Sequence, residues 1–278
     1  MKNFLLLICA SLIFSSCSIR QMLLNNLDWL AIRQLEDTFD LDDKQIKVIE
    51  PQIERIHKQL KTQTSLQITG VISRFKQNAS DGLSREEIDE AFAGFQKIRK
   101  DFLLEHSEAI SRFLKGLSEK QLNHYEKELL ERDEELVELL SSDNFEEEMV
   151  DYVEDQTDRL HYWFGDLTPA QMTIVAKHTK QTKEGLKRYL EKRRKRRALL
   201  MTKVRLVSEE ELKVFFDNWA YQPNLRSKLA NIPGKPWDEW FKEFLLDIFA
   251  TLNKKQKAQF NERLEGIMED LRAFSRVS

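Results

Sequence analysis

The sequence predicts an all-α fold, a bundle of long helices followed by a C-terminal helical pair. Three observations support this prediction. Glycine and proline are scarce, with 8 and 5 residues among 278, whereas an all-β fold needs many turns that use them. Apolar residues recur at steps of three, four or seven, which is the period of a helix with one buried face. Finally, one short phrase occurs six times.

Each of these phrases consists of an apolar residue, a capping residue, two further residues and then Gln or Glu. This is the capping box, in which the cap side chain accepts from the third helical residue and the Gln or Glu reaches back. The phrases lie 34 to 50 residues apart, which favours a bundle over a regular solenoid. The cap residues are Asp42, Ser84, Ser118, Thr168, Ser208 and Asn253, followed by Gln45, Glu87, Gln121, Gln171, Glu211 and Gln256.

The N-terminal bundle is predicted over 17–220, and a loop that contains Pro223, Pro233, Gly234 and Pro236 is predicted over 221–236. The C-terminal pair follows over 237–278 and packs on the bundle, with helices at 237–251 and 253–274. The first helix of this pair is rich in aromatic residues at helical spacing. Such spacing predicts core packing rather than a membrane-facing patch, and the residues are Trp237, Trp240, Phe241, Phe244 and Phe249.

Residues 1–16 have the order of a secretory signal peptide, with Lys2 followed by an uncharged apolar run. This run is too short to span a bilayer. Two small residues then precede Cys17, and the arrangement resembles the lipobox of bacterial lipoproteins. That resemblance implies removal of residues 1–16 and a lipid on Cys17; the alternative is an ordinary signal peptide with an incidental cysteine. Ser18 after the cysteine favours the outer membrane, facing the periplasm, by resemblance to enterobacterial sorting.

Two charge blocks lie close together in the sequence. Residues 126–158 hold 15 acidic and 2 basic residues, and residues 177–205 hold 13 basic and 2 acidic residues. The basic block indicates either an anionic partner, such as lipopolysaccharide or peptidoglycan, or internal pairing with the acidic block, which we favour. Nucleic acid is not an expected partner, because the overall net charge is −3 and a secreted lipoprotein has little access to it.

The basic block contains a candidate interaction groove formed by Arg193, Arg194 and Arg197. Arg193 and Arg197 bridge an apolar stripe and should therefore face inward or line a groove. Buried arginines need carboxylate partners, and Glu148 or Asp155 are the partners that we expect.

No motif in the sequence indicates catalysis. A phosphate-binding loop, a nucleophile elbow and a His-Glu-x-x-His zinc motif are all missing. The pairs Glu54/His57 and Asp158/His161 have a spacing found in di-iron bundles, but a chance match among so many carboxylates is the better interpretation. We therefore predict no enzyme, no metal and no cofactor.

The chain resembles a family of proteobacterial lipoproteins whose function is not established. The resemblance covers most of the chain and includes a phrase with Asn25, Asp28 and Leu30, followed by Phe39 to Asp42 with Gln45. It continues with His57 and Lys58 and with Trp163 to Gln171. The Leu-Pro that often follows the histidine is missing, so the second helix is expected to run on differently.

A weaker resemblance is to small periplasmic chaperones of the Spy and CpxP type, which also use Leu-Thr-x-x-Gln at helix starts. We therefore predict a lipid-anchored, non-enzymatic cell-envelope protein that binds or organises an envelope component. The alternative is a membrane-anchored, ATP-independent chaperone.

Overall fold

The computed structural model describes residues 17–276 except 80–81, 181, 224 and 226–236. Every regular element in these ranges is a helix, which confirms the all-α prediction. The proposed signal peptide lies outside the described residues, as does most of the predicted loop at 221–236. No helix in the described ranges is long and apolar enough to cross a membrane.

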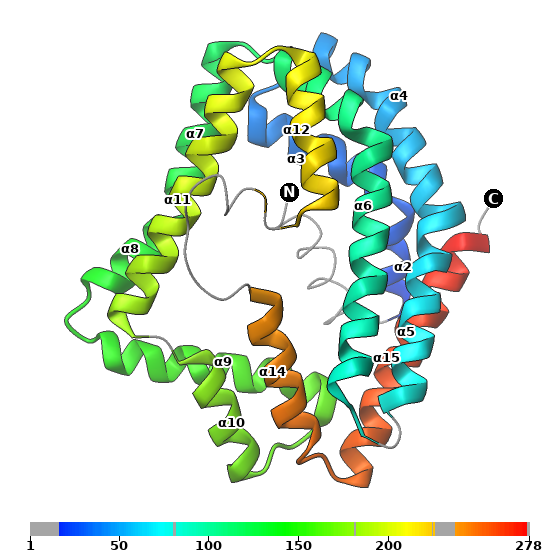
Figure 1. Cartoon of the computed structure of the whole chain (residues 1–278), viewed down its shortest axis with the longest axis vertical. Helices are drawn as coiled ribbons and strands as arrows, with labels where there is room; N and C mark the ends of the chain where they lie inside the picture. The colour runs from blue at the N-terminus through cyan, green and yellow to red at the C-terminus, as the bar shows by residue number, and fades with distance from the viewer. Residues whose placement is uncertain (1–16, 80–81, 181, 224, 226–236, 277–278) are drawn as a thin grey trace.

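The first half of the chain forms helices that follow one another with short connections (Figure 1). In chain order they are α2 (Cys17–Asn25), α3 (Leu27–Phe39), α4 (Asp43–Gln59), η1 (Leu60–Thr64), α5 (Ser65–Ala79), α6 (Arg85–Lys115), α7 (Glu119–Glu131) and α8 (Glu134–Ser141). The second half contains α9 (Phe145–Phe164), α10 (Pro169–Thr179), α11 (Lys183–Leu206), α12 (Glu209–Tyr221), α14 (Trp237–Phe249) and α15 (Lys254–Arg276).

The helix that follows the first capping box is long. It continues from α4 through η1 into α5 without a break. The segment η1 is a π-helical turn, in which backbone hydrogen bonds join residues five positions apart instead of four. The result is one long rod, Asp43–Ala79, beside α6 (Figure 1).

All six predicted capping boxes form. At Asp42, Ser84, Ser118, Thr168 and Ser208 both reciprocal hydrogen bonds are present. At Asn253 the side chain accepts from Gln256 N at 3.0 Å, and Gln256 Oε1 accepts from Asn253 N at 3.1 Å. Such caps contribute about 1 kcal/mol each to helix stability.

The described residues form three apolar cores, and the two larger ones lie at opposite ends of the molecule (Figure 1). One core joins α3, α6, α7, α11 and α12 around residues such as Leu212 and Phe216. The other core joins α5, α9, α10, α14 and α15 around Val175 and Ile248. Full burial of such side chains contributes roughly 1.5 to 3 kcal/mol each, so both ends are firmly packed.

The aromatic residues of α14 pack mainly in the second core, as their spacing predicted. Phe244 and Phe249 are buried, and Trp240 and Phe241 are partly buried. The side chain of Trp237 lies outside the described residues. The following helix, α15, packs against α5, α9 and α2, so the C-terminal pair is in contact with the bundle.

Candidate functional site

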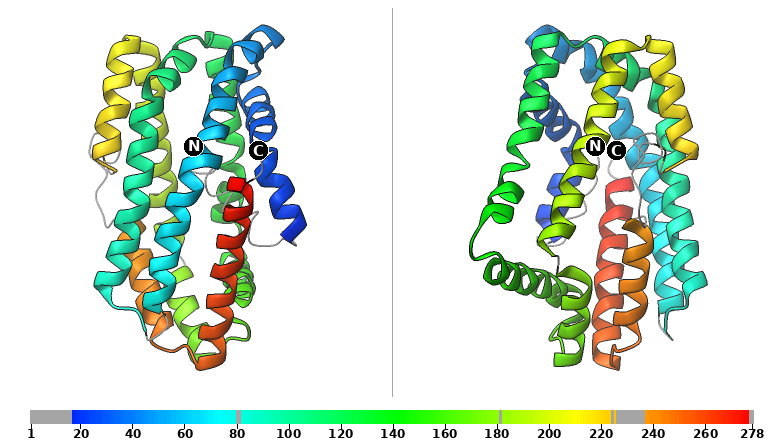
Figure 2. Two further views of the ribbon diagram at one scale, coloured as in Figure 1. Left: turned by 90° about the vertical axis from the view of Figure 1, so that its right-hand side faces the viewer. Right: turned by 60° about the vertical axis from the view of Figure 1, so that its left-hand side comes forward.

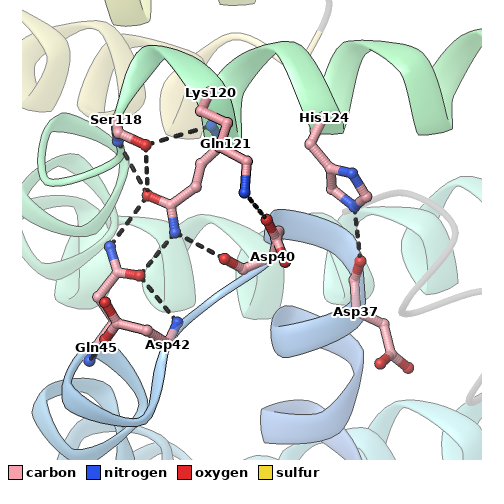
Figure 3. A network of polar contacts seen from close by, with 8 residues as sticks. All are labelled: Asp37, Asp40, Asp42, Gln45, Ser118, Lys120, Gln121 and His124. Carbon is pink, nitrogen blue, oxygen red and sulfur yellow. Dashed lines mark hydrogen bonds and ion pairs between the residues drawn. The ribbon is translucent and has the colours of Figure 1, made fainter.

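Two capping boxes meet where α4 and α7 begin, and their glutamines bond to each other (Figure 3). Gln121 Nε2 donates to Gln45 Oε1 at 2.7 Å, and Gln45 Nε2 donates to Gln121 Oε1 at 3.1 Å. Gln121 Nε2 also donates to the carbonyl of Asp40 at 3.0 Å. A hydrogen bond from Lys120 lowers the pKa of the Asp40 carboxyl. The glutamine at the third helical position of each box therefore links the N-terminal ends of α4 and α7.

The same network occurs a second time, where α10 and α15 begin. Gln171 and Gln256 donate to each other at 2.9 Å in both directions, and both side chains are buried. Gln256 Nε2 donates to the carbonyl of Asp166 at 2.9 Å, as Gln121 does to that of Asp40. Asp166 and Gln171, unlike Gln256, belong to the phrases on which the resemblance to the lipoprotein family is based. Their geometry gives the phrases a structural role, which is to join helices.

A further pair from the same resemblance comes together near the start of the described chain. His57 Nδ1 lies 3.2 Å from Asp28 Oδ2, and His57 Nε2 lies 3.2 Å from the carbonyl of Leu24. The ring also stacks on Phe274, with 5.6 Å between centroids. The pair therefore connects the α2–α3 corner to α4 and to the end of α15.

The helix that begins at Cys17 is fixed directly to the body of the protein. Arg20 Nε lies 2.6 Å from Asp270 Oδ2 on α15, and Arg20 Nη1 donates to the Tyr162 hydroxyl at 3.0 Å. Both charged side chains are buried. Figure 2 shows α2 beside α15, in agreement with their contacts. Beside Arg20 and Tyr162 lies an open pocket of about 270 Å³, which Glu262, Arg263, Glu265, Gly266 and Glu269 also line.

The three candidate arginines of α11 converge on one fully buried carboxylate, that of Asp133. Arg193 Nε lies 3.2 Å from Asp133 Oδ1, while Arg194 Nε and Arg197 Nη1 lie 3.4 Å and 2.8 Å from Oδ2. Arg197 Nη1 also donates to the carbonyl of Leu129 at 2.7 Å. Burial and the neighbouring Arg193 charge lower the pKa of Arg197.

This geometry corrects the expected partners. The carboxylate is that of Asp133, at the start of α8, and neither Glu148 nor Asp155 takes this place. Arg193 and Arg197 do face inward, since their side chains retain only 21% and 19% of their exposure. Inward-facing cations were predictable from the apolar stripe. The identity of the partner was not, because α9, which carries Glu148 and Asp155, runs away from α11 (Figure 2).

The two charge blocks neutralise each other only in part. Between them, the described residues form ion pairs through Asp133, through Arg205 with Glu126, and through Lys180 with Glu146. The other acidic residues of 126–158 make no ion pair with the basic block. The internal pairing that we favoured from the sequence is therefore present, and it leaves part of each block without a partner in the other.

Four cations on the outer side of α11 have no ion-pair partner among the described residues. They are Arg188, Lys192, Lys195 and Arg196, here called the basic face. Their spacing of i, i+4, i+7 and i+8 places them on one side of the helix, away from buried Leu190, Met201 and Val204. Arg188 and Lys195 are exposed, whereas Arg196 is half-buried and burial lowers its pKa.

Comparisons with family models, with curated proteins and with solved structures found no match. Among the described residues, no group of three or more His, Cys, Asp or Glu side chains has the arrangement of a metal site. The geometry thus presents two features for function, an N-terminal helix fixed to the body and the basic face of α11.

Proposed function

We propose that this chain is a lipid-anchored, non-enzymatic protein of the cell envelope that binds an anionic envelope component through the basic face. The observation that carries the proposal is that Arg188, Lys192, Lys195 and Arg196 share one side of α11 and have no acidic partner among the described residues. Cations without partners raise the local potential and attract anions. On other sides of the same helix, Arg193, Arg194 and Arg197 bind Asp133.

The charges around Asp133 support a basic character of this part of α11. One buried carboxylate faces three guanidinium groups, so this part of α11 keeps an excess of positive charge even after internal pairing. Because Asp133 and Leu129 hold Arg197 in place, the helix that carries the basic face is fixed in orientation. An anion that binds there meets a preorganised surface, which lowers the entropic cost of binding.

The anchor in this proposal is Cys17, acylated after removal of residues 1–16. Cys17 is the first residue of α2, and Arg20, one turn later, is bonded to Asp270. Little flexible chain would therefore separate the lipid from the body, and the body would sit close to the membrane in a defined orientation. Two or more acyl chains anchor a protein stably, whereas one does not. The outer membrane, facing the periplasm, is the location that we propose.

In-cell photo-crosslinking tests the binding role. A photoreactive residue at Lys195, on the basic face, should capture one defined envelope component. The same residue at exposed Lys47 on α4 serves as the control and should not capture it. Capture of many unrelated unfolded proteins at Lys195 would instead support the alternative, an anchored chaperone. Equal yields at both positions would contradict a specific role for α11.

A further inference from the structure

The first four turns of α9 carry an exposed acidic face that mirrors the basic face of α11. It consists of Glu147, Asp151, Glu154, Asp155 and Asp158, and all five side chains are exposed. None of them forms an ion pair with another described residue. The first four have the spacing i, i+4, i+7 and i+8, so they lie on one side of the helix.

The basic face has the same spacing with the opposite charge. Counted from Glu147 on α9 and from Arg188 on α11, each face places charges at positions 0, 4, 7 and 8. Eight residues of helix rise by about 12 Å, so the two faces have equal length. Four cations on one helix can therefore lie opposite four carboxylates on the other.

Within one chain these two faces do not meet. The N-terminal ends of α9 and α11 lie close together, where Lys183 lies over the Phe145 ring and Lys180, which precedes α11, pairs with Glu146. From that corner they diverge (Figures 1 and 2), and no ion pair joins the acidic face to the basic face. Among the described residues, therefore, neither face has its charges paired with the other.

We propose that the anionic partner of the basic face is the acidic face of a second copy of this chain. In a two-fold dimer, α9 of each copy would face α11 of its partner, which forms the same contact twice. This inference rests on the proposed function, since it names the partner of the basic face. Anchoring in one membrane raises the effective concentration of the copies, so modest surface ion pairs suffice to bring them together.

Charge reversal with a mixing step tests this pairing on the full-length protein in a nonionic detergent, with sedimentation velocity as the measurement. We expect a dimer at about 50 mM salt that weakens by about tenfold at about 500 mM, because salt screens exposed charges. The first variant, Arg188→Glu with Lys195→Glu, places two carboxylates at positions 0 and 7 of the basic face. The second, Glu147→Lys with Glu154→Lys, places two lysines at the same two positions of the acidic face. Each variant alone should lose the dimer.

Mixing the two variants should restore it, because each carboxylate introduced on α11 of one variant then lies opposite a lysine introduced on α9 of the other, and the second contact keeps its native charges. The control, Lys44→Glu with Lys47→Glu on exposed positions of α4, changes the charge by the same amount and should leave the dimer unchanged. Restoration also shows that both variants are folded. A monomeric wild type, or a mixture that stays monomeric, overturns the inference.

The outcome is separable from that of the proposed function. If Lys195 crosslinks to another envelope component in cells and never to a second copy, the basic face is a binding surface and the dimer inference fails. If the dimer forms but Cys17 carries no lipid, the envelope proposal fails and the self-association stands.

Discussion

Replacing Asp133 by Asn should destabilise the protein strongly while changing almost no volume. The Asp133 side chain is fully buried and is the one carboxylate within ion-pair distance of Arg193, Arg194 and Arg197 among the described residues. Removing one partner of a buried ion pair typically costs 3–5 kcal/mol, because the other charge stays buried and unpaired. Since Arg193 and Arg197 retain about a fifth of their exposure, we expect the lower end, about 3 kcal/mol.

Such a loss is a large part of a typical stability of 5 to 15 kcal/mol. For a chain of this size, 1 kcal/mol shifts the melting temperature by roughly 2 to 4 °C. Thermal unfolding followed by circular dichroism should therefore show a decrease of about 10 °C. The control, Asp143→Asn, removes an exposed carboxylate from the same acidic block and should shift the melting temperature little.

Further variants separate the effect of the unpaired charges on stability from the effect of packing. Adding Arg193→Met and Arg197→Met to Asp133→Asn removes the unpaired cations and should recover most of the lost stability. By contrast, Arg193→Glu with Arg197→Glu places two new carboxylates against Asp133 and should destabilise more than Asp133→Asn. An unchanged melting temperature in Asp133→Asn would refute the reasoning, since it would mean that water already solvates the arginines in the folded protein.

Three further predictions concern other buried polar groups. Burial lowers the pKa of His106 from its ordinary 6.5. As the pH falls, His106 is therefore protonated in the unfolded chain before it is protonated in the folded protein. Stability should fall as the pH falls from about 6.5 through the lower folded pKa, and His106→Gln should flatten this dependence in unfolding curves at several pH values. Gln171→Ala removes the buried hydrogen bonds between Gln171 and Gln256 and should lower the free energy of unfolding by about 2 kcal/mol. Gln45→Ala, at the less buried pair with Gln121, should lower it by less, and urea titration compares the two variants. Arg20→Ala leaves Asp270 buried without this partner and should cost about 3 kcal/mol, with faster proteolysis within α2 as a second readout.

Helix starts were the most predictable part of this fold. A capping box is a local device, and the residues that form it lie within four positions of one another, so six of them could be read directly from the sequence. Which boxes meet was not predictable in this way. All six phrases look alike, and the contacts between Gln45 and Gln121 or between Gln171 and Gln256 span 76 and 85 residues.

The candidate site was partly predictable for a similar reason. The apolar stripe of α11 indicated that Arg193 and Arg197 face inward, and they do. The choice of Glu148 or Asp155 as partner was wrong, because spacing treats all acidic residues of the block alike. Only the packing of α8 against α11 distinguishes Asp133 from them. The signal that would have helped is its position between α7 and α8, at a break where a side chain can turn toward the neighbouring helix.

The proposed envelope function depends above all on a lipid on Cys17. Mass spectrometry of the mature N-terminus, on protein isolated from cells, tests it most directly. We predict an acylated Cys17 as the first residue, with residues 1–16 removed, and we predict that Cys17→Ala abolishes stable membrane association. Recovery of Cys17 with a free, unmodified thiol would contradict the lipid anchor and the envelope function together.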